Sequence, residues 1–360
     1  MNIDHGGTAL VDLAGVWRSI LPTAGEIRAA RRRLHGKAIC IAGLVAMSYW
    51  GLVIADFGAV LRVTCAALLV FGLVAVATNI MHDANHGAFS RLRWLNRLAS
   101  YTGDALGLSS WLWRFKHNTL HHGSPNVEGV DSDIDQAPFA RLSPGQPWRP
   151  WHRLQHFYLW PLYGFMAIKN LLIGDFKNLA TRRIGDESLH SRPGPAVVIP
   201  VLVGKLFHVG WALVVPLVFN PWWVVLVFYV CMSWLVGFTL AVTFQLAHCV
   251  EGAAFVDTTA PHRGPDFIPH QLHTTANVAC TVPVLGSVFR WIVGGLDHQI
   301  EHHLAPRLPH TIYPALGARF RRACDGLSST NYRVHTGVWA ALRSHARWLK
   351  RMSHPTTALS

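Results

Sequence analysis

Four long apolar stretches alternate with polar, aromatic and basic segments along the chain. Each stretch is close to the ~20 residues that a helix needs to cross the hydrocarbon core of a bilayer. Short turns at 56–58 and 220–221 join the stretches in pairs. The pattern predicts an all-α membrane protein with four transmembrane helices in two hairpins, over about residues 38–55, 59–80, 195–219 and 222–247.

A fifth apolar stretch, at 157–173, is shorter and is interrupted by Pro161 and Gly164 among other residues. If it crossed the membrane once, the histidines before it and after it would lie on opposite sides. We therefore expect an interfacial or re-entrant helix here. In the third span, Lys205 is expected to snorkel toward the cytosolic surface and His208 to be a packed histidine.

Lysine and arginine set the expected orientation. They are frequent at the N-terminus, between the hairpins and in the C-terminal part, but the two short turns contain neither. The positive-inside rule then places both termini and the large polar segments in the cytosol, and we expect a multi-pass protein of a bacterial inner membrane. One domain is expected over 1–360, comprising a cytosolic segment (1–37), a hairpin (38–80), a cytosolic and interfacial segment (81–194), a second hairpin (195–247) and a cytosolic helical cap (248–360).

The composition supports a membrane partner. The 360 residues are 51% hydrophobic, include 15 tryptophans and carry a formal net charge of +13. Tryptophan and basic residues gather at the bilayer interface, so this combination favours lipid over nucleic acid. The six cysteines form no CxxC pair, so neither a zinc ribbon nor a disulfide framework is indicated.

Histidine is the unusual residue, with 22 copies against 19 acidic residues. Histidine is the commonest metal ligand in proteins. On a helix, residues four apart share one face while adjacent residues diverge by about 100°, so histidine clusters with these spacings can face two ions. Eight histidines occur in such clusters or at the end of a predicted span, namely His82, His86, His117, His121, His122, His248, His302 and His303.

Eight imidazoles are too many for one ion, so the sequence predicts two. In the predicted topology all eight lie on the cytosolic side. Imidazole suits iron, copper, zinc and nickel, so the ligand type alone does not choose the metal. Nearby polar residues are candidates to orient the rings, namely Asp83, Asn85, Asn118, Asp297 and Glu301.

The clusters resemble those of the membrane fatty acid desaturase family. The resemblance covers about residues 38–315 and rests on HDANH at 82–86, HNTLHH at 117–122 and HQIEHH at 298–303. The longer stretch GGLDHQIEHHLAPRLPH, at 294–310, is most similar to the front-end branch, whose third cluster has glutamine in place of the first histidine. His270-Gln271 and Thr275-Ala276-Asn277 are also similar to that branch.

The resemblance implies a non-haem centre of two iron ions that uses O₂ to desaturate a fatty acyl chain. Its iron ligands would be the eight histidines, and Gln299 would be a ligand or lie behind one. His298, His270 and His273 have weaker claims. The acyl chain would lie in a narrow apolar tunnel near the cytosolic ends of the second and fourth spans, lined by residues that include Thr243, Phe244 and Ala247.

The sequence contains no HPGG haem-binding motif, so we expect electrons from a separate carrier such as a ferredoxin or a free cytochrome b5. The acyl group could arrive as acyl-CoA, on acyl carrier protein or in an acyl lipid. The nearest alternative activity is hydroxylation or acetylene formation at the same centre. More distant alternatives are a zinc-dependent membrane hydrolase, which needs fewer ligands, and a haem electron carrier or transporter, whose haem ligands would lie within the spans.

Overall fold

The computed structural model describes residues 12–189, 193–257, 267–280, 282–324 and 331–355. Most of these residues are helical; η marks 3-10 turns (η3, η7) or wide π turns (η1, η2, η4, η5). The first half contains α1 (Leu13–Ser19), α2 (Ala24–Val53), α3 (Ala59–Ala75), η1 (Val76–Met81), α4 (His82–Asn85), α5 (Arg93–Ala105), α6 (Ser110–Trp113), η2 (Arg114–His121), η3 (Pro150–Leu154), α7 (Gln155–Tyr163), α8 (Met166–Lys169), η4 (Asn170–Gly174) and α9 (Asp175–Thr181).

The second half continues with α10 (Pro195–Val209), η5 (Gly210–Val214), α11 (Val215–Phe219), α12 (Trp222–His248), α13 (Phe267–Thr274), α14 (Pro283–Val293), α15 (Gln299–Leu304), η7 (His310–Ile312), α16 (Tyr313–Cys324) and α17 (Val338–Met352). Two short sheets complete the described part. One pairs β1 (Arg183–Ile184) with β2 (Glu187–Ser188) antiparallel, and the other pairs β3 (Asn277–Val278) with β4 (Val334–His335) in parallel.

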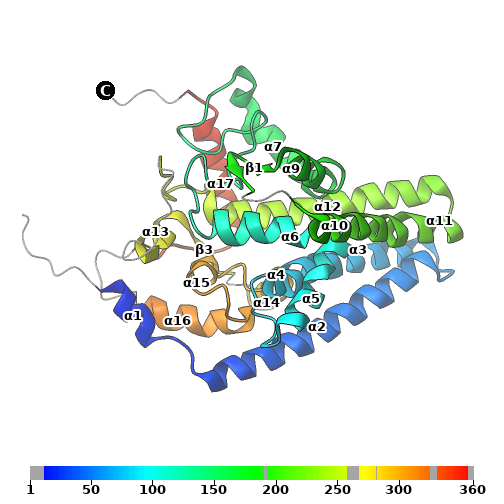
Figure 1. Cartoon of the computed structure of the whole chain (residues 1–360), viewed down its shortest axis with the longest axis horizontal. Helices are drawn as coiled ribbons and strands as arrows, with labels where there is room; N and C mark the ends of the chain where they lie inside the picture. Colours follow the sequence, from blue (N-terminus) through cyan, green and yellow to red (C-terminus); the bar gives the residue numbers. More distant parts are fainter. Residues whose placement is uncertain (1–11, 190–192, 258–266, 281, 325–330, 356–360) are drawn as a thin grey trace, which may run out of the picture.

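Four helices of the described chain are long and apolar enough to cross a membrane, which confirms the predicted all-α class and number of spans. The second combines α3, η1 and α4, and the third combines α10, η5 and α11. Figure 1 shows these long helices extending to one side, while the shorter elements gather at the other end. The four spans cover Ala24–Val53, Ala59–Asn85, Pro195–Phe219 and Trp222–His248.

The first span helix begins at Ala24, well before the apolar stretch that starts at residue 38. Thr23 and Glu26 explain this early start. The Thr23 hydroxyl accepts a hydrogen bond from the Glu26 amide (3.3 Å), and the Glu26 carboxylate accepts one from the Thr23 amide (2.7 Å). This reciprocal capping satisfies two amides that no helical carbonyl can reach. The basic residues before the apolar stretch are therefore helical; residues 1–11 of the predicted N-terminal segment lie outside the described part.

The stretch at 157–173, which we expected to be interfacial or re-entrant, is not one continuous helix. It is split between α7, α8 and η4, and the break lies where it crosses α12. Trp234 of α12 donates from Nε1 to the carbonyl of Pro161 (3.0 Å). Gly164 leaves the space for this indole, because a Cβ atom there would overlap the Trp234 ring. The stretch is therefore not one of the four long span helices.

The prediction that Lys205 snorkels is wrong. Its side chain is buried, and Nζ donates to Asp175 Oδ2 (2.6 Å) and to the carbonyls of Gly107 (2.5 Å) and Asn170 (3.0 Å). The sequence alone does not show that the Asp175 carboxylate of α9 lies next to Lys205 of α10. His208 is a packed histidine as predicted: its Nδ1 lies 3.0 Å from a backbone carbonyl and its Nε2 lies 3.1 Å from the Tyr229 hydroxyl.

We predict that Lys205→Met destabilises the protein by about 3–5 kcal/mol, because it leaves the Asp175 carboxylate buried without its partner. The apparent Tm of the purified protein in detergent should fall. The double variant Lys205→Met/Asp175→Leu should recover part of the loss, since it removes both charges. If Lys205→Met has the same apparent Tm as the wild type, the ion pair is not needed for stability.

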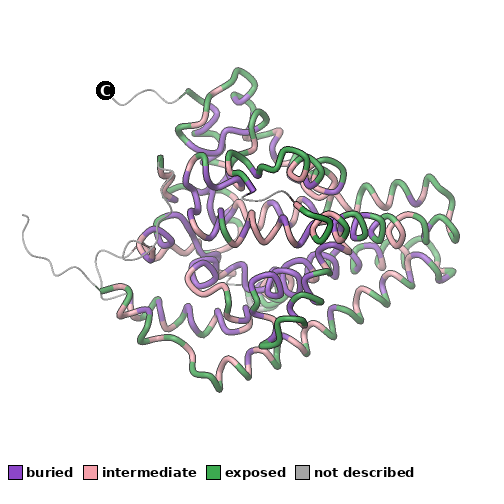
Figure 2. The backbone as a smooth tube through the Cα atoms, in the orientation of Figure 1, coloured by how far each residue is buried: buried purple, intermediate pink, exposed green. Residues whose placement is uncertain are grey.

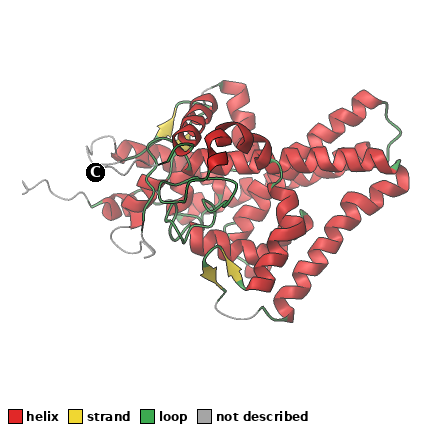
Figure 3. Cartoon of the chain, turned by 90° about the horizontal axis from the view of Figure 1, so that it is seen from above, coloured by secondary structure: helices red, strands yellow, loops and turns green. Residues whose placement is uncertain are grey.

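The short elements at one end of the long helices include a compact group made of α1, α13, α15, η7 and α16. We call this group, which is smaller than the segment 248–360 and also contains α1, the cap from here on. Its core contains Leu272, Ile300, Leu316 and Phe320, and the Trp17 ring packs edge-on against Phe320 at 5.0 Å. Each such buried side chain contributes about 1.5–3 kcal/mol of hydrophobic stabilisation. Figure 2 shows burial concentrated where the cap meets the helix ends. Figure 3, seen from above, again shows the long helices extending to one side and the shorter elements gathered at the other end.

Candidate metal centre

The structure brings all eight predicted histidines together where the cap meets the ends of the second and fourth spans. α4 carries the first of them at the end of the second span, and α12 ends in another. The first adjacent pair lies at the end of η2, where His122 is the C-cap, and the second lies in α15. Each of the eight side chains is buried, with at most 7% of its surface exposed; they are His82, His86, His117, His121, His122, His248, His302 and His303.

Two wide helical turns place ligand-bearing residues. η1 leads into α4, and η2 with its C-cap residue contains the second cluster. In η2 the amide of His122 donates to the carbonyl of His117 (2.9 Å), a bond between residues five apart. Such wide turns are often found at functional sites. Here the Nε2 atoms of His117 and His122 come within 3.2 Å of each other.

The eight imidazoles form two groups with one ring between them. In the first group, the candidate ligand atoms of His82, His86, His117 and His302 lie within 4.8 Å of one another. The second group contains His121, His248 and His303, within the same distance. Metal–nitrogen bonds of about 2.1 Å place opposite ligands about 4.2 Å apart, so each group is compact enough that it could hold one ion.

His122 lies between the two groups. Its ring centroid is 4.7 Å from that of His86 in the first group and 4.3 Å from that of His303 in the second. Asp133 can combine with His117 and His121 in a further candidate set, but this carboxylate is only half-buried and the set overlaps both groups. The arrangement therefore supports two adjacent metal positions.

Several ring nitrogens at the centre are buried and have no hydrogen-bond partner in the described structure. They include both nitrogens of His82, Nε2 of His86, His121 and His302, and Nδ1 of His122. A buried polar atom without a partner costs about 1–3 kcal/mol, so native proteins rarely leave several together. Metal coordination would satisfy one nitrogen of each of these rings. The donor set, made of imidazoles, also fits a first-row transition metal such as iron.

Comparison with known proteins identifies the family. The fatty acid desaturase family model matches residues 57–334. The chain is 35% identical over 291 residues to the sn-1 linoleoyl-lipid 6-desaturase of Arthrospira platensis, covering 79% of this chain and 76% of the relative. This chain belongs to the fatty acid desaturase family. The desaturase is therefore an oxidoreductase.

Two further relatives show the range of the named activities. The desaturase is 32% identical over 297 residues to the sn-1 linoleoyl-lipid 6-desaturase of Synechocystis sp., covering 81% of this chain and 80% of the relative. It is 31% identical over 286 residues to the acyl-lipid (8-3)-desaturase of Physcomitrium patens, covering 78% of this chain and 58% of that longer protein. These names agree with the similarity to the front-end branch.

Oxygen atoms lie beside Nδ1, the ring nitrogen directed away from the metal positions, in four of the desaturase's histidines. Nδ1 of His121 lies 3.1 Å and 3.2 Å from the two carboxylate oxygens of Asp131. Nδ1 of His303 donates to Gln271 Oε1 (2.9 Å). An acceptor at Nδ1 fixes the proton there, so that the lone pair of Nε2 faces the metal position.

The other two rings use a backbone carbonyl and a phenol. Nδ1 of His248 donates to the carbonyl of Thr274 (3.2 Å). Nδ1 of His302 lies 3.4 Å from the hydroxyl oxygen of Tyr313, whose own proton points to backbone carbonyls. Sequence reasoning missed all four partners. Asp131 could have been found from the acidic stretch ten residues after His121, and Gln271 from the His270-Gln271 pair that is similar to the front-end branch. Nothing in the sequence indicates the other two.

Burial keeps most of the imidazoles neutral. It lowers the pKa well below the ordinary histidine value for five of them, and neighbouring imidazoles lower it further, for His86, His117, His122, His302 and His303. A neutral ring is the form that binds a metal. These rings are therefore ready to coordinate at neutral pH.

His121 differs from these five. Burial opposes its protonation, but the charge and hydrogen bond of Asp131, with help from Asp133, outweigh burial and raise the pKa of His121. In turn His121, together with two backbone amides, overcomes burial and lowers the pKa of Asp131 to about 2. Asp131 is thus an anion at neutral pH and is available to stabilise positive charge behind this ring.

The five residues predicted to orient the rings take different roles. Asp83 lies beside its neighbouring ligand, with Oδ1 at 3.6 Å from His82 Nδ1. Its other oxygen accepts hydrogen bonds from the amide and Nδ1 of His310, both at 3.0 Å. Asn118 Nδ2 donates to the carbonyl of Asn85 (3.0 Å), so this pair ties α4 to η2.

The remaining two carboxylates bind other residues. Asp297 pairs with Arg290 at 3.2 Å. Glu301 accepts hydrogen bonds from the Tyr332 hydroxyl (2.6 Å) and from Asn277 Nδ2 (2.9 Å). Glu301 thus anchors α15 to the strand β3, and its Oε2 also lies 3.6 Å from Nδ1 of His298.

The weaker candidates lie outside both groups. His270 Nε2 lies 3.1 Å from a backbone carbonyl of the loop after η2, and His273 is exposed. His298 lies beside Glu301, at 3.6 Å. Gln299 is buried, and its Nε2 has no partner in the described structure, so its role stays a prediction.

The residues predicted to line the acyl tunnel lie near the centre on α12. The Phe244 ring is 5.9 Å from that of His117. The Thr243 hydroxyl donates to the carbonyl of Thr239 (2.7 Å), and Ala247 is fully buried. Trp113 lies closer, with its ring 4.2 Å from His117. The tunnel assignment stays a prediction.

Proposed function

We propose that this desaturase uses O₂ and two iron ions to introduce a double bond into an acyl chain of a membrane lipid. The two adjacent groups of buried imidazoles, with His122 between them, carry this proposal. Each group has the size of one ion site, and the unpartnered nitrogens suit a metal. Membership of the family supports iron over the other metals that imidazole can bind.

The relatives support a lipid-bound substrate. Two of them are named as linoleoyl-lipid desaturases and the third as an acyl-lipid desaturase. The candidate ligands of this chain follow directly on the ends of two apolar spans, within reach of an acyl chain in the bilayer. We therefore favour an acyl lipid over acyl-CoA or acyl carrier protein.

In our proposal the whole chain forms one domain, with the metal centre and both termini in the cytosol of a bacterial cell. The cluster of basic residues before the first span and the positive-inside rule support this orientation. Electrons would come from a separate carrier, such as a ferredoxin or a cytochrome b5, which meets the protein on its cytosolic side.

The overall reaction takes one acyl chain, O₂, two electrons and two protons to an unsaturated chain and two molecules of water. The iron ions, held by the eight histidines, would supply the oxidising power that O₂ alone lacks toward an unactivated C–H bond. The protein keeps water out, since all eight rings are buried. Oxygen partners such as Asp131 and Gln271 keep the ligand nitrogens directed at the metal positions.

Expression in a bacterial host with a suitable electron donor, followed by mass spectrometry of its lipids, tests the proposal. We expect acyl chains that are two hydrogens lighter than the substrate, and iron in the purified protein. Acyl chains that are one oxygen atom heavier than the substrate would show that the enzyme hydroxylates instead of desaturating. Zinc without iron would favour a hydrolase, and a Soret band would favour a haem protein.

A further inference from the structure

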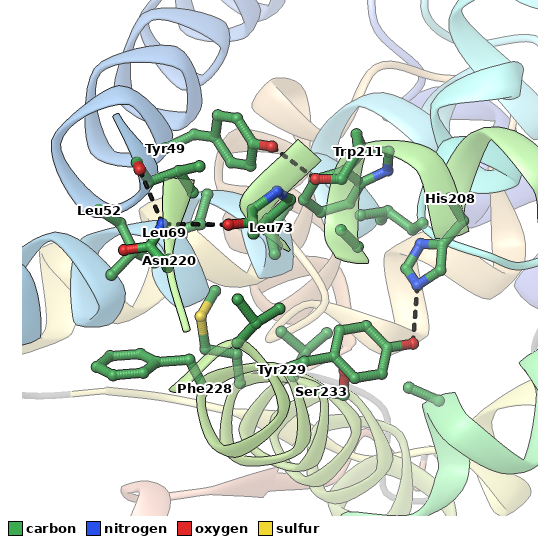
Figure 4. A pocket seen from close by; sticks show the side chains of 18 of the residues that line it. Tyr49, Leu52, Leu69, Leu73, His208, Trp211, Asn220, Phe228, Tyr229 and Ser233 are labelled. Carbon is green, nitrogen blue, oxygen red and sulfur yellow. Dashed lines mark hydrogen bonds between the residues drawn. The ribbon is translucent and has the colours of Figure 1, made fainter. Parts of the chain in front are cut away.

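The first span helix begins well before its apolar stretch, on the side of the cap. We call these leading residues, 24–37, the α2 extension; Figure 1 shows it lying along the cap. The family model begins at residue 57, so the extension lies outside the matched region. Farther along the same helix, the Tyr49 hydroxyl donates to the carbonyl of Trp211 in the third span (2.6 Å; Figure 4). The α2 extension is therefore one end of a helix that is also fixed among the spans.

The α2 extension is bonded to the turn that follows the first histidine cluster. Arg31 Nε donates to the carbonyl of Ala88 (3.2 Å), and Nε2 of His35 lies 2.9 Å from the carbonyl of Phe89. The rings of His35 and Phe89 also pack against each other, with centroids 5.0 Å apart. These contacts fix the segment just after α4, the helix that carries the first ligands.

The α2 extension is also bonded to η7, which follows the third histidine cluster. The Thr311 hydroxyl donates to the carbonyl of Ala30 (2.7 Å), and Nη2 of Arg33 donates to the carbonyl of Thr311 (3.4 Å). Ala30 is fully buried and packs with Tyr313, whose hydroxyl lies 3.4 Å from Nδ1 of His302. The extension therefore holds together two segments that lie behind ligands of the first group.

A chain of polar contacts leads from Lys37, at the end of the α2 extension, to the first group. Lys37 Nζ lies 3.2 Å from Nε2 of His310. An ammonium group is only a donor, so Nε2 accepts and the ring proton lies on Nδ1. Nδ1 and the backbone amide of His310 then both donate to Asp83 Oδ2, at 3.0 Å. The other carboxylate oxygen, Oδ1, lies 3.6 Å from Nδ1 of the ligand His82.

Lys37 thus decides how His310 meets Asp83. Burial lowers the pKa of His310, so the ring is neutral and has a single donor nitrogen. Without the ammonium group the proton could move to Nε2, and the lone pair of Nδ1 would then face the Asp83 carboxylate and repel it. Asp83 would no longer be held beside His82, whose two ring nitrogens have no hydrogen-bond partner in the described structure. Lys37 itself is held over the ring of Trp291, 5.2 Å from its centroid.

The second group is supported by other segments. The oxygen atoms beside Nδ1 of its three rings come from the loop after η2 and from α13, and they belong to Asp131, Gln271 and Thr274. The support of the first group comes instead from η7, the start of α16 and the α2 extension. Because the two groups depend on different segments, a change in one support should affect one metal position more than the other.

We propose that Lys37 and His310 are positioning residues of the first metal position, and that the α2 extension secures the ion there without supplying a ligand. This inference rests on the proposed pair of iron ions. The extension acts through Asp83 on the ring of His82 and through Tyr313 on the ring of His302. Loss of these contacts empties the first position and leaves the second position filled.

Iron release from the purified, iron-loaded protein to a soluble chelator tests the proposal without turnover. Lys37→Met removes the ammonium group and keeps a long side chain, and His310→Leu removes the ring donor. In both variants half of the iron should leave about 10- to 100-fold faster than in the wild type, and the other half at the wild-type rate. After the fast phase, the oxidised variants should show the EPR signal of an isolated ferric ion, because the remaining ion has lost its magnetic neighbour.

Two further variants separate positioning from a general loss of structure. Arg32→Met is the matched control, because Arg32 is exposed on the same extension, and it should release iron like the wild type. His310→Asn keeps an N–H donor close to the place of Nδ1 and should restore much of the slow release. Lys37 is half-buried, so Lys37→Met carries the test alone if His310→Leu lowers the yield of folded protein.

Two results would overturn the inference. One is release at the wild-type rate in Lys37→Met and His310→Leu, and the other is equal acceleration of both halves of the iron. A wild type that binds no iron would instead overturn the proposed function.

Discussion

The His302→Ala variant is expected to insert into the membrane normally and to yield no desaturated product above background. His302 belongs to the first group, its Nε2 is buried without a partner, and its ring lies 4.5 Å from that of His82. Alanine removes one of few nitrogens that can hold the ion there. The purified variant should therefore contain less iron than the wild type.

His273→Ala is the matched control for this variant. His273 lies close to the His270-Gln271 pair that is similar to the family, but its side chain is exposed and lies outside both groups. Lipid profiles, iron content by elemental analysis and the yield of membrane-inserted protein should be compared. Wild-type turnover in His302→Ala would refute the ligand assignment, whereas loss of insertion in both variants would point to a folding defect.

The Asp131→Asn variant should lose about 10- to 100-fold in iron affinity or turnover, the usual effect of removing a carboxylate behind a ligating histidine. Asp131 binds Nδ1 of His121 and accepts the amide of Asn126 at 2.9 Å. The neutral amide keeps the shape of the side chain. It removes the anion that holds the proton on Nδ1 and stabilises charge on the ring.

Asp135→Asn provides the comparison in the same loop, because Asp135 is exposed and its carboxylate accepts only a local amide in the described structure. Iron affinity is measured by competition with a soluble chelator, and turnover by lipid analysis. Asp131→Glu should keep part of the activity, because it retains the negative charge. If Asp131→Asn and Asp135→Asn behave alike, Asp131 does not position His121.

The spans and the candidate ligands could be predicted because each follows from a local pattern in the sequence. Apolar runs of the length of a bilayer indicate the helices, and adjacent histidine pairs with an upstream partner indicate the clusters. The structure adds how these clusters divide into two groups. That division depends on a bond between residues five apart in η2, which helical spacing alone does not indicate.

Contacts between distant residues could not be predicted. Gln271 reaches His303 across 32 residues, and Asp83 meets His310 across 227. The same limit explains the error at Lys205, whose carboxylate partner is 30 residues away in another helix. Nor could the sequence show that Asp297 and Glu301, besides facing the His298 ring, bind an arginine, a tyrosine and an asparagine.

The buried, unpartnered nitrogens of the centre also bear on the life of the protein in the cell. Several of these groups are buried without a hydrogen-bond partner in the described structure, which costs free energy at the junction between the cap and the spans unless a metal binds them. We therefore expect metal binding and local folding to be coupled. Chains made during iron starvation should open more often at this junction and be degraded faster, so that the supply of iron would govern the abundance of the enzyme as well as its activity.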